Sequence, residues 1–552
     1  DSVEVIWNDG TYQVLRTVKP NQLLGVAYDP IGKYKPRRGS TPTYFQEISA
    51  TDLGLDYVHV ESEFNDFAQT PLLPHKHSQN GPPMAVADVD GNGLEDIFIG
   101  SDFGQKSYLY FQQSTGRFTK KELQKEANQE DTGALFFDAD LDGDQDLYVV
   151  SGGSHANAPS DAYQDRLYLN DGKGHLTLSR QALPILTISG SCVSTCDFDH
   201  DGDLDLFRGS RLIPGQYPMP ASSFLFKNEG GRFIDVTTQT APELRNIGLV
   251  TSAVWADFDK DGLPDLALCG EWMPITILKN TGKQFSHSLI HSFAQSSGWW
   301  NTLAAADFDN DGDLDLLAGN LGLNTKYKAS PEQLIELFAA DFDKNGRIDP
   351  VITYYNDRQQ WIRQTRDLLT AQIPSMKRRF PNFDTYANTV FNESFTEEER
   401  KSAYHLKATE FRSIYYENIG NGFKAHPLPV EAQFGPVFGI LVDDFNKDGY
   451  QDALLIGNSY ASETIGGWYD ASKGALLLGG KRDGFVVSNL KGLTADKEAK
   501  SIVQLHQQNA ASMIIIGNTN SPLQVFTRVN NDERYTSLQR HNRSVYARNT
   551  YP

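Results

Sequence analysis

The chain has 552 residues, only three cysteines and a formal charge of −21 at pH 7. The negative charge argues against nucleic-acid binding, which requires a basic surface, and so few cysteines exclude a small disulfide-stapled scaffold. The longest apolar runs, such as residues 513–516, are far too short to cross a bilayer as a helix.

Two alternating apolar runs open the chain. Val3, Val5 and Trp7 occupy alternate positions, and a second run with Tyr12 and Val14 at alternate positions follows an Asp9–Gly10 turn. This pattern predicts a β-hairpin. The first residues carry no signal peptide, and we expect the sequence to begin inside a longer protein. Residues 43–48, which include Tyr44, Phe45 and Ile48, then predict a strand that has no partner nearby in the sequence.

One nine-residue pattern, D-x-[DN]-x-[DN]-G-x-x-D, organises most of the remaining chain. Its seven copies begin at Asp88, Asp138, Asp197, Asp257, Asp307, Asp341 and Asp444. Small or apolar residues precede most copies and an apolar run follows each, which predicts a strand, a loop and a second strand. A further apolar run ending in an Asn/Gly turn, as at residues 224–230, predicts two more strands. Four strands per repeat are typical of a β-propeller blade.

The spacing of the motif glycines bears on the number of blades. Most neighbouring motif glycines are 50 to 60 residues apart, but Gly312 and Gly346 are separated by 34 and Gly346 and Gly449 by 103. We therefore expect the sixth motif in an extra hairpin of the fifth blade, which gives seven blades. If it heads a blade of its own, there are eight.

A degenerate unit at residues 512–526 lacks the acidic loop, and we expect the strand at 43–48 to pair with it and close the ring. The fold class is therefore an all-β propeller over residues 40–530, preceded by a small β segment at residues 1–35. Residues 531–552 are expected to be a C-terminal tail.

Residues 357–411 interrupt the blade pattern and are predicted to form a helical insertion. Thr396 and Glu399 have the spacing of a capping box. The segment has a basic stretch at 377–379 and many aromatic residues, which favours a folded flap over a linker; the aromatic residues include Trp361, Phe380, Phe383, Tyr386, Phe391 and Phe395. We expect this flap to pack on the propeller, and hypothesise that it also contributes to docking a protein partner.

Loops with an oxygen-bearing side chain at every second position bind hard cations, and Ca²⁺ takes six to eight oxygen ligands. We expect ligands from the side chains at positions 1, 3, 5 and 9, with the last one bidentate, and from the backbone carbonyl at position 7. Gly at position 6 permits the sharp turn. An EF-hand would need a Glu at position 12, where the first copy has Ile99 in a strand. The sequence thus predicts up to seven structural Ca²⁺ sites in β-hairpin loops.

The expected ligands in the seven loops are Asp88, Asp90, Asn92, Leu94 and Asp96; Asp138, Asp140, Asp142, Asp144 and Asp146; Asp197, Asp199, Asp201, Asp203 and Asp205; Asp257, Asp259, Asp261, Leu263 and Asp265; Asp307, Asp309, Asp311, Asp313 and Asp315; Asp341, Asp343, Asn345, Arg347 and Asp349; and Asp444, Asn446, Asp448, Tyr450 and Asp452.

Aromatic residues are frequent in the loops expected on the opposite side of the propeller, between the second and third strands or between blades. Exposed rings with polar neighbours are typical of sugar stacking and of protein-binding hot spots, although such rings can also cap the blade cores. The candidate ligand-binding residues are Tyr163, Tyr217, Trp272, Trp299, Trp300, Tyr460, Trp468 and Tyr469.

The sequence contains no GxSxG, HExxH or phosphate-binding loop, and no catalytic residue is assigned. His75 and His77 could reach a metal from one strand face, but no third ligand is recognisable and a solvated loop is favoured. The alternative to a binding module is a carbohydrate-active propeller enzyme, a polysaccharide lyase or a glycosidase. A carboxylate pair about 5–9 Å apart beside the tryptophans would favour that alternative.

The loops and their strands resemble FG-GAP/VCBS repeats, as in the integrin α-subunit propeller and in cartilage acidic protein. Residues 1–35, with the runs 5–10 and 21–24, resemble the C-terminal part of an ASPIC/UnbV domain, which accompanies such repeats in surface or secreted proteins of Bacteroidetes-type bacteria. The resemblance implies a Ca²⁺-binding module, extracellular or on the bacterial outer membrane as a secreted protein or lipoprotein. It also implies a protein or glycan partner, with an accessory role in a SusC/SusD-type outer-membrane complex as one setting.

Overall fold

The computed structural model describes residues 2–6, 11–19, 22, 24–28, 33–34, 44–123, 126, 128–287, 293–481, 484–488, 490–506 and 512–529. The chain divides into two compact units, one made of Asp1–Gln46, Leu490–Leu493 and Arg528–Pro552, and the other of Glu47–Asn489 and Thr494–Thr527.

The first unit contains the hairpin that the N-terminal alternation predicts. β1 (Ser2–Ile6) pairs antiparallel with β2 (Thr11–Arg16), and β3 (Lys33–Tyr34) adds a third strand beside β2. Trp7, the Asp9–Gly10 turn and the tail 531–552 lie outside the described residues.

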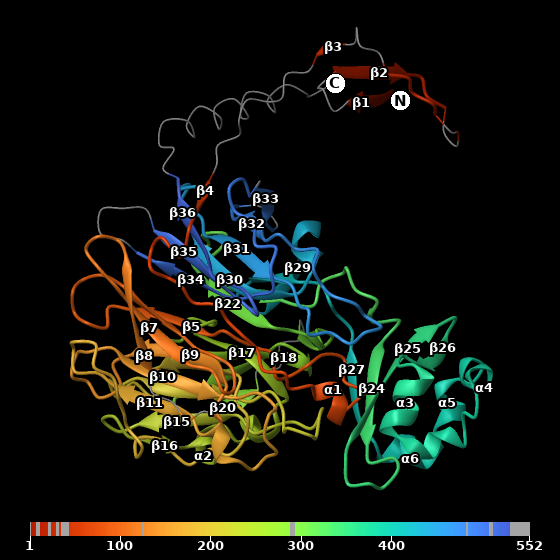
Figure 1. Ribbon diagram of the computed structural model, residues 1–552, viewed down its shortest axis with the longest axis horizontal. Coiled ribbons are helices and arrows are strands. Elements are labelled where there is room, and N and C mark those ends of the chain that lie inside the picture. The colour runs from red at the N-terminus through yellow and green to blue at the C-terminus, as the bar shows by residue number, and fades with distance from the viewer. Residues whose placement is uncertain are drawn as a thin grey trace. The chain divides into compact units, whose positions relative to one another are not determined.

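Seven antiparallel sheets, six with four strands and one with five, make up most of the described part of the second unit (Figure 1). The first four sheets are β5 (Met84–Ala87), β6 (Asp96–Ile99), β7 (Ser107–Gln112) and β8 (Phe118–Leu123); β9 (Asp131–Phe137), β10 (Asp146–Ser151), β11 (Arg166–Leu169) and β12 (Thr177–Leu178); β13 (Cys192–Cys196), β14 (Asp205–Gly209), β15 (Phe224–Asn228) and β16 (Phe233–Asp235); and β17 (Leu249–Ala256), β18 (Asp265–Met273), β19 (Thr276–Asn280) and β20 (Phe285–His287), where β21 (Gly298–Trp299) also pairs with β18. The other three are β22 (Thr302–Ala306), β23 (Asp315–Gly319), β28 (Ile414–Asn418) and β29 (Phe423–Pro427); β30 (Val437–Asp443), β31 (Asp452–Gly457), β32 (Ala475–Leu478) and β33 (Val486–Ser488); and β34 (Ala499–Leu505), β35 (Met513–Asn518), β36 (Gln524–Arg528) and β4 (Phe45–Ile48).

These seven sheets are the blades of a closed β-propeller. The first strand of each blade contacts the first strand of the next, in the order β5, β9, β13, β17, β22, β30 and β34, and β34 returns to β5. β4, the strand expected at residues 43–48, is the fourth strand of the last sheet, beside β36 of the degenerate unit. The ring therefore closes on a sheet built from distant parts of the chain.

The second strands of the blades explain the apolar runs that follow each motif. In β6, β10, β14, β23, β31 and β35 every residue is buried, because neighbouring blades pack against both faces of each sheet. One core cluster, for example, joins Phe98 and Leu109 of the first blade to Leu147 and Val149 of the second. Strands buried on both faces read as continuous apolar runs rather than as alternating ones.

An eighth sheet, with four strands, interrupts the fifth blade between β23 and β28 (Figure 1). It consists of β24 (Ile335–Ala340), β25 (Asp349–Asn356), β26 (Gln359–Ile362) and β27 (Tyr404–Ala408), in the order β26-β25-β24-β27. The sixth motif is the loop between β24 and β25. The sixth motif thus lies within the fifth blade's part of the chain and heads no blade of the ring, as expected. The expected extra hairpin of that blade is wrong, because β24 pairs with β25 and β27 in a sheet of its own.

Helices follow β26 in this insertion: α3 (Arg366–Gln372), the 3-10 helix Pro374–Lys377, α4 (Phe383–Ala387), α5 (Phe391–Ser394) and α6 (Glu397–Ser402). The capping box of Thr396 and Glu399 is present at α6. The predicted range 357–411 was too narrow and not purely helical, because the excursion begins after β23 and contains a sheet. Short helices elsewhere are α1 (Asp66–Gln69), α2 (Thr237–Thr240) and the 3-10 helices Asp161–Tyr163, Pro242–Asn246 and Val430–Gln433.

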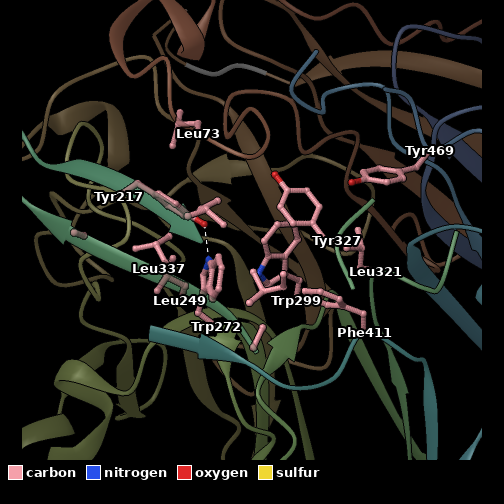
Figure 2. Close-up of a cluster of buried hydrophobic side chains, with 14 residues drawn as sticks. Leu73, Tyr217, Leu249, Trp272, Trp299, Leu321, Tyr327, Leu337, Phe411 and Tyr469 are labelled. Carbon is pink, nitrogen blue, oxygen red and sulfur yellow. Dashed lines mark hydrogen bonds between the residues drawn. The ribbon is translucent and has the colours of Figure 1, made fainter. Parts of the chain in front are cut away.

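The insertion packs on the propeller through a cluster of buried side chains (Figure 2). Trp272 and Trp299 from the fourth blade meet Tyr327, Leu337 and Phe411 from the insertion. The ring centroid of Trp299 lies 4.8 Å from that of Tyr327 and 5.3 Å from that of Phe411. Within the described ranges, no helix has the length and apolar character needed to cross a membrane.

Candidate metal centre

The first Asp of each motif closes its loop by accepting backbone N–H groups. In the first loop, Asp88 Oδ1 accepts from the N–H of Asn92 at 3.1 Å, and Oδ2 accepts from that of Gly93 at 2.8 Å. The position-6 glycine has a positive φ in all seven loops, between 82° for Gly93 and 102° for Gly202, as the sequence predicts. The seven loops thus share one backbone geometry.

The last Asp of each motif is buried beneath its loop. Asp96 Oδ2 accepts the N–H of Val89 at 3.0 Å, and Oδ1 accepts that of Gln112, on the third strand, at 2.8 Å. Both oxygens therefore already accept a backbone donor, and each has one remaining lone pair for a cation. Burial raises the pKa of Asp96 to about 7 and that of Asp146 to about 6.

Positions 1, 3 and 9 converge in each of the first three loops, where one oxygen from each carboxylate lies within 4.8 Å of the others. The side chain at position 5 makes a hydrogen bond within the loop: its oxygen accepts the N–H of position 7, as Asp142 Oδ1 does from Asp144 at 3.0 Å. In the second loop, Asp138 Oδ1 and Asp140 Oδ1 are buried and have no hydrogen-bond partner. These oxygens fit a hard cation, which would supply the missing interaction.

An asparagine at the end of the third strand joins neighbouring loops, a role that the sequence analysis did not recognise. Asn228 Nδ2 donates to the carbonyl of Ala139, in the loop of the preceding blade, at 2.8 Å, and to that of Leu204 in its own loop at 3.2 Å. Asn170, Asn280 and Asn418 make the same inter-blade bond at 2.8 Å. The sequence signal for this contact is the Asn in each Asn/Gly turn, but the turn pattern alone predicts no bond between blades.

Two loops carry a lysine among their carboxylates. Lys227 Nζ contacts Asp199 Oδ2 and lies 2.8 Å from Asp201 Oδ2 in the third loop, and Lys279 contacts the equivalent pair in the fourth. At the same place on the third strand, the fifth blade has Glu417. Burial raises the pKa of Asp309, and the charges of Asp311, Asp307 and Glu417 raise it further. The loops therefore differ in net charge although they share one backbone geometry.

Six of the eight candidate ligand-binding aromatics are buried, and the expectation that they are exposed is wrong for these: Tyr163, Tyr217, Trp272, Trp299, Trp300 and Tyr469. Several of them lie beneath the insertion, whose position could not be anticipated from local patterns. Trp468, in contrast, is 68% exposed, and its ring centroid lies 5.1 Å from that of the half-buried Tyr460. Both residues lie between β31 and β32, in the loop type that the sequence analysis proposed.

The expectation that His75 and His77 lie in a solvated loop is also wrong. His77 is 1% exposed, and His75 Nε2 lies 2.8 Å from Glu271 Oε1 at the end of β18. Glu271 is therefore the third polar group beside His75 and His77, and the sequence did not reveal it.

Comparison with known proteins identifies the repeats. Residues 88–149, 138–207 and 257–318 match the sequence profile of an FG-GAP-like repeat. The chain thus carries FG-GAP-like repeats in a β-propeller, as the resemblance implied, whereas the ASPIC/UnbV segment stays a prediction. No curated protein matches the chain.

Solved structures that align with most of this chain share little sequence identity with it. The biofilm matrix protein Bap1 of V. cholerae is 11% identical over 90% of this chain and 92% of its own, with a TM-score of 0.35. Sqt1 of Saccharomyces cerevisiae is 11% identical over 84% and 100%, with a TM-score of 0.40. The Dos1 propeller is 7% identical over 86% and 96%, with a TM-score of 0.36. Similarities this weak have no bearing on function.

Proposed function

We propose that this chain is a Ca²⁺-stabilised β-propeller that recognises a protein or glycan partner at a cell surface. The repetition of one loop geometry supports the Ca²⁺ part most strongly, because carboxylates at positions 1, 3 and 9 converge in successive blades. Their charges repel one another and their burial is unfavourable, as the raised pKa values of the position-9 aspartates indicate. A bound divalent cation offsets both effects and stabilises the folded state.

Ca²⁺ suits these loops better than Mg²⁺. Each loop offers four side chains and a backbone carbonyl, and Ca²⁺ accepts such irregular sets of six to eight oxygens. Mg²⁺ requires octahedral geometry at shorter distances and retains several waters. The ligands in this proposal are the 35 residues assigned from the sequence, with position 9 contributing through the lone pairs that its backbone hydrogen bonds leave.

The recognition part of the proposal relies on Trp468 and Tyr460. An exposed tryptophan held beside a tyrosine offers an apolar surface with polar edges, which suits a sugar ring or the hot spot of a protein partner. In this proposal the module is extracellular or on the bacterial outer membrane, secreted or lipid-anchored, with a SusC/SusD-type complex as one setting. The alternative of a polysaccharide lyase or glycosidase loses its expected site, because Trp272, Trp299 and Trp300 are buried.

Two measurements test the proposal. EDTA should lower the melting temperature markedly, and Ca²⁺ should restore it better than Mg²⁺; an unchanged melt in metal-free protein would contradict the structural role. Binding to a glycan array and to surface proteins of the native cell should be lost in Trp468→Ala. Val430→Ala, which removes another exposed apolar side chain, is the matched control and should bind as the wild type does.

A further inference from the structure

A second group of metal-ligating side chains lies apart from the Asp loops. His75 and His77 come from the segment between α1 and β5, and Glu271 comes from the end of β18, 196 residues after His75. One ligand atom from each of the three lies within 4.8 Å of the other two. The group belongs to the propeller, and Trp272, next to Glu271, is part of the cluster in Figure 2.

His77 is the first sign that a ligand is missing. It is 1% exposed, and neither of its ring nitrogens has a hydrogen-bond partner. Its ring centroid lies 4.9 Å from that of His75 and 4.8 Å from that of Tyr217. A buried imidazole without any polar partner is unfavourable, since burial removes its bonds to water and nothing replaces them.

His75 shows a second conflict. Its Nε2 lies 2.8 Å from Glu271 Oε1, which only accepts hydrogen bonds when ionised, and 3.2 Å from Arg211 Nη2, which only donates. One ring nitrogen cannot donate to the first and accept from the second at the same time. A cation between the imidazole and the carboxylate removes the conflict, because both groups then direct lone pairs at it.

The groups around His75, His77 and Glu271 are of the kind that surrounds a bound metal ion. The Tyr217 hydroxyl lies 3.4 Å from Glu271 Oε2 and accepts the indole N–H of Trp272 at 2.6 Å, drawn in Figure 2. Such outer hydrogen bonds hold a ligating carboxylate in place. Beside the group is a cavity of about 40 Å³ lined by His75, Arg211 and Glu271, enough for a bound water in an open coordination position.

We propose that His75, His77 and Glu271 bind one Zn²⁺ ion, with a water as the fourth ligand. Two imidazoles and one carboxylate form a ligand set typical of Zn²⁺, whereas Ca²⁺ prefers oxygen ligands alone. Arg211 now contacts Glu271, and its other guanidinium nitrogen donates to Asn80 Oδ1 at 2.8 Å. On metal binding the guanidinium turns towards Asn80 and leaves Glu271 to the ion. This site does not depend on the proposed function, because it shares no residue with the Asp loops.

The test uses the full chain with saturating Ca²⁺, so that the Asp loops are filled, and Co²⁺ as a spectroscopic substitute for Zn²⁺. One equivalent of Co²⁺ should give the intense visible absorption of a tetrahedral nitrogen-ligated ion, and Zn²⁺ should abolish it. His77→Ala and Glu271→Gln should each weaken binding by about a hundredfold or more, whereas the exposed His175→Ala should bind as the wild type does. Absence of the band in the wild type, or its retention in His77→Ala, would overturn the proposal.

Wild-type melting and one further variant keep the test decisive if the ligand variants fail to fold. In Ca²⁺ buffer, Zn²⁺ should raise the melting temperature of the wild type. An unchanged melting temperature would count against the site. Arg211→Met removes the competing cation, so its Zn²⁺ affinity should rise and Zn²⁺ should restore its stability. If the group is only a buried ion pair, Arg211→Met is destabilised and Zn²⁺ has no effect on it.

Discussion

The inter-blade asparagines give the most quantitative prediction for the fold. Asn228 is fully buried, and its side chain makes three hydrogen bonds: to the carbonyls of Ala139 and Leu204, and from the N–H of Gly231 at 2.9 Å. Each of the three bonds contributes roughly 1 kcal/mol, and leaving the fully buried carbonyl of Ala139 unpaired adds about 1 kcal/mol more. Asn228→Ala should therefore lower the free energy of unfolding by about 4 kcal/mol.

Urea denaturation of the Ca²⁺-saturated protein measures this value without interference from metal occupancy. The exposed Asn246, changed to Ala, is the control and should shift the free energy of unfolding by less than about 0.5 kcal/mol. Equal stabilities of the two variants would refute the inter-blade role. A shift in Asn228→Ala that vanishes in the absence of Ca²⁺ would show that the asparagine acts on the metal sites instead of on the contact between blades.

Three further predictions concern other parts of the second unit. Lys227→Met should tighten Ca²⁺ binding at the third loop roughly tenfold, since it removes a cation from beside Asp199, and a calcium titration with unchanged weak sites would contradict this. Burial and the charge of Asp102 raise the pKa of Glu61 from 4.5 to about 9, so the folded state binds more protons than the unfolded state and stability falls as the pH rises through this range. Glu61→Gln should remove that fall and melt above the wild type near about pH 8.5, and parallel melting curves across pH would contradict it. Leu337→Ala, in the cluster of Figure 2, should cost about 3 kcal/mol, whereas the exposed Leu323→Ala should cost little in the same urea titration.

The loops could be predicted from the sequence because their determinants are local. Nine consecutive residues contain the Asp that closes the loop, the glycine with positive φ and the Asp beneath it, so one pattern fixes the whole turn. The fourth motif position shows the limit of this reasoning, since Leu141 and His200 adopt left-handed backbone there although the pattern leaves that residue free. The closing strand could be predicted as well, because a predicted strand without a local partner must pair elsewhere in the chain.

The features that the sequence did not reveal depend on contacts between distant segments. Trp272 and Trp299 read as exposed loop residues because nothing near them in the sequence indicates that the insertion covers them. Glu271 follows the fourth motif closely, but its approach to His75 depends on how the segment before the first blade packs. The sixth motif was ambiguous because a loop of this type forms equally well in an inserted sheet as in a blade.

The Ca²⁺ stoichiometry of the purified chain tests the central claim most directly. Equilibrium dialysis with atomic emission should find five tightly bound Ca²⁺ ions per chain, and two weaker ones from the loops that contain Lys227 and Lys279. Asp309→Ala, which removes a ligand from the fifth loop, should lose one tight ion and keep the others. Binding of no more than one ion, or an Asp309→Ala variant with the full wild-type number, would contradict the assignment of the loops as Ca²⁺ sites.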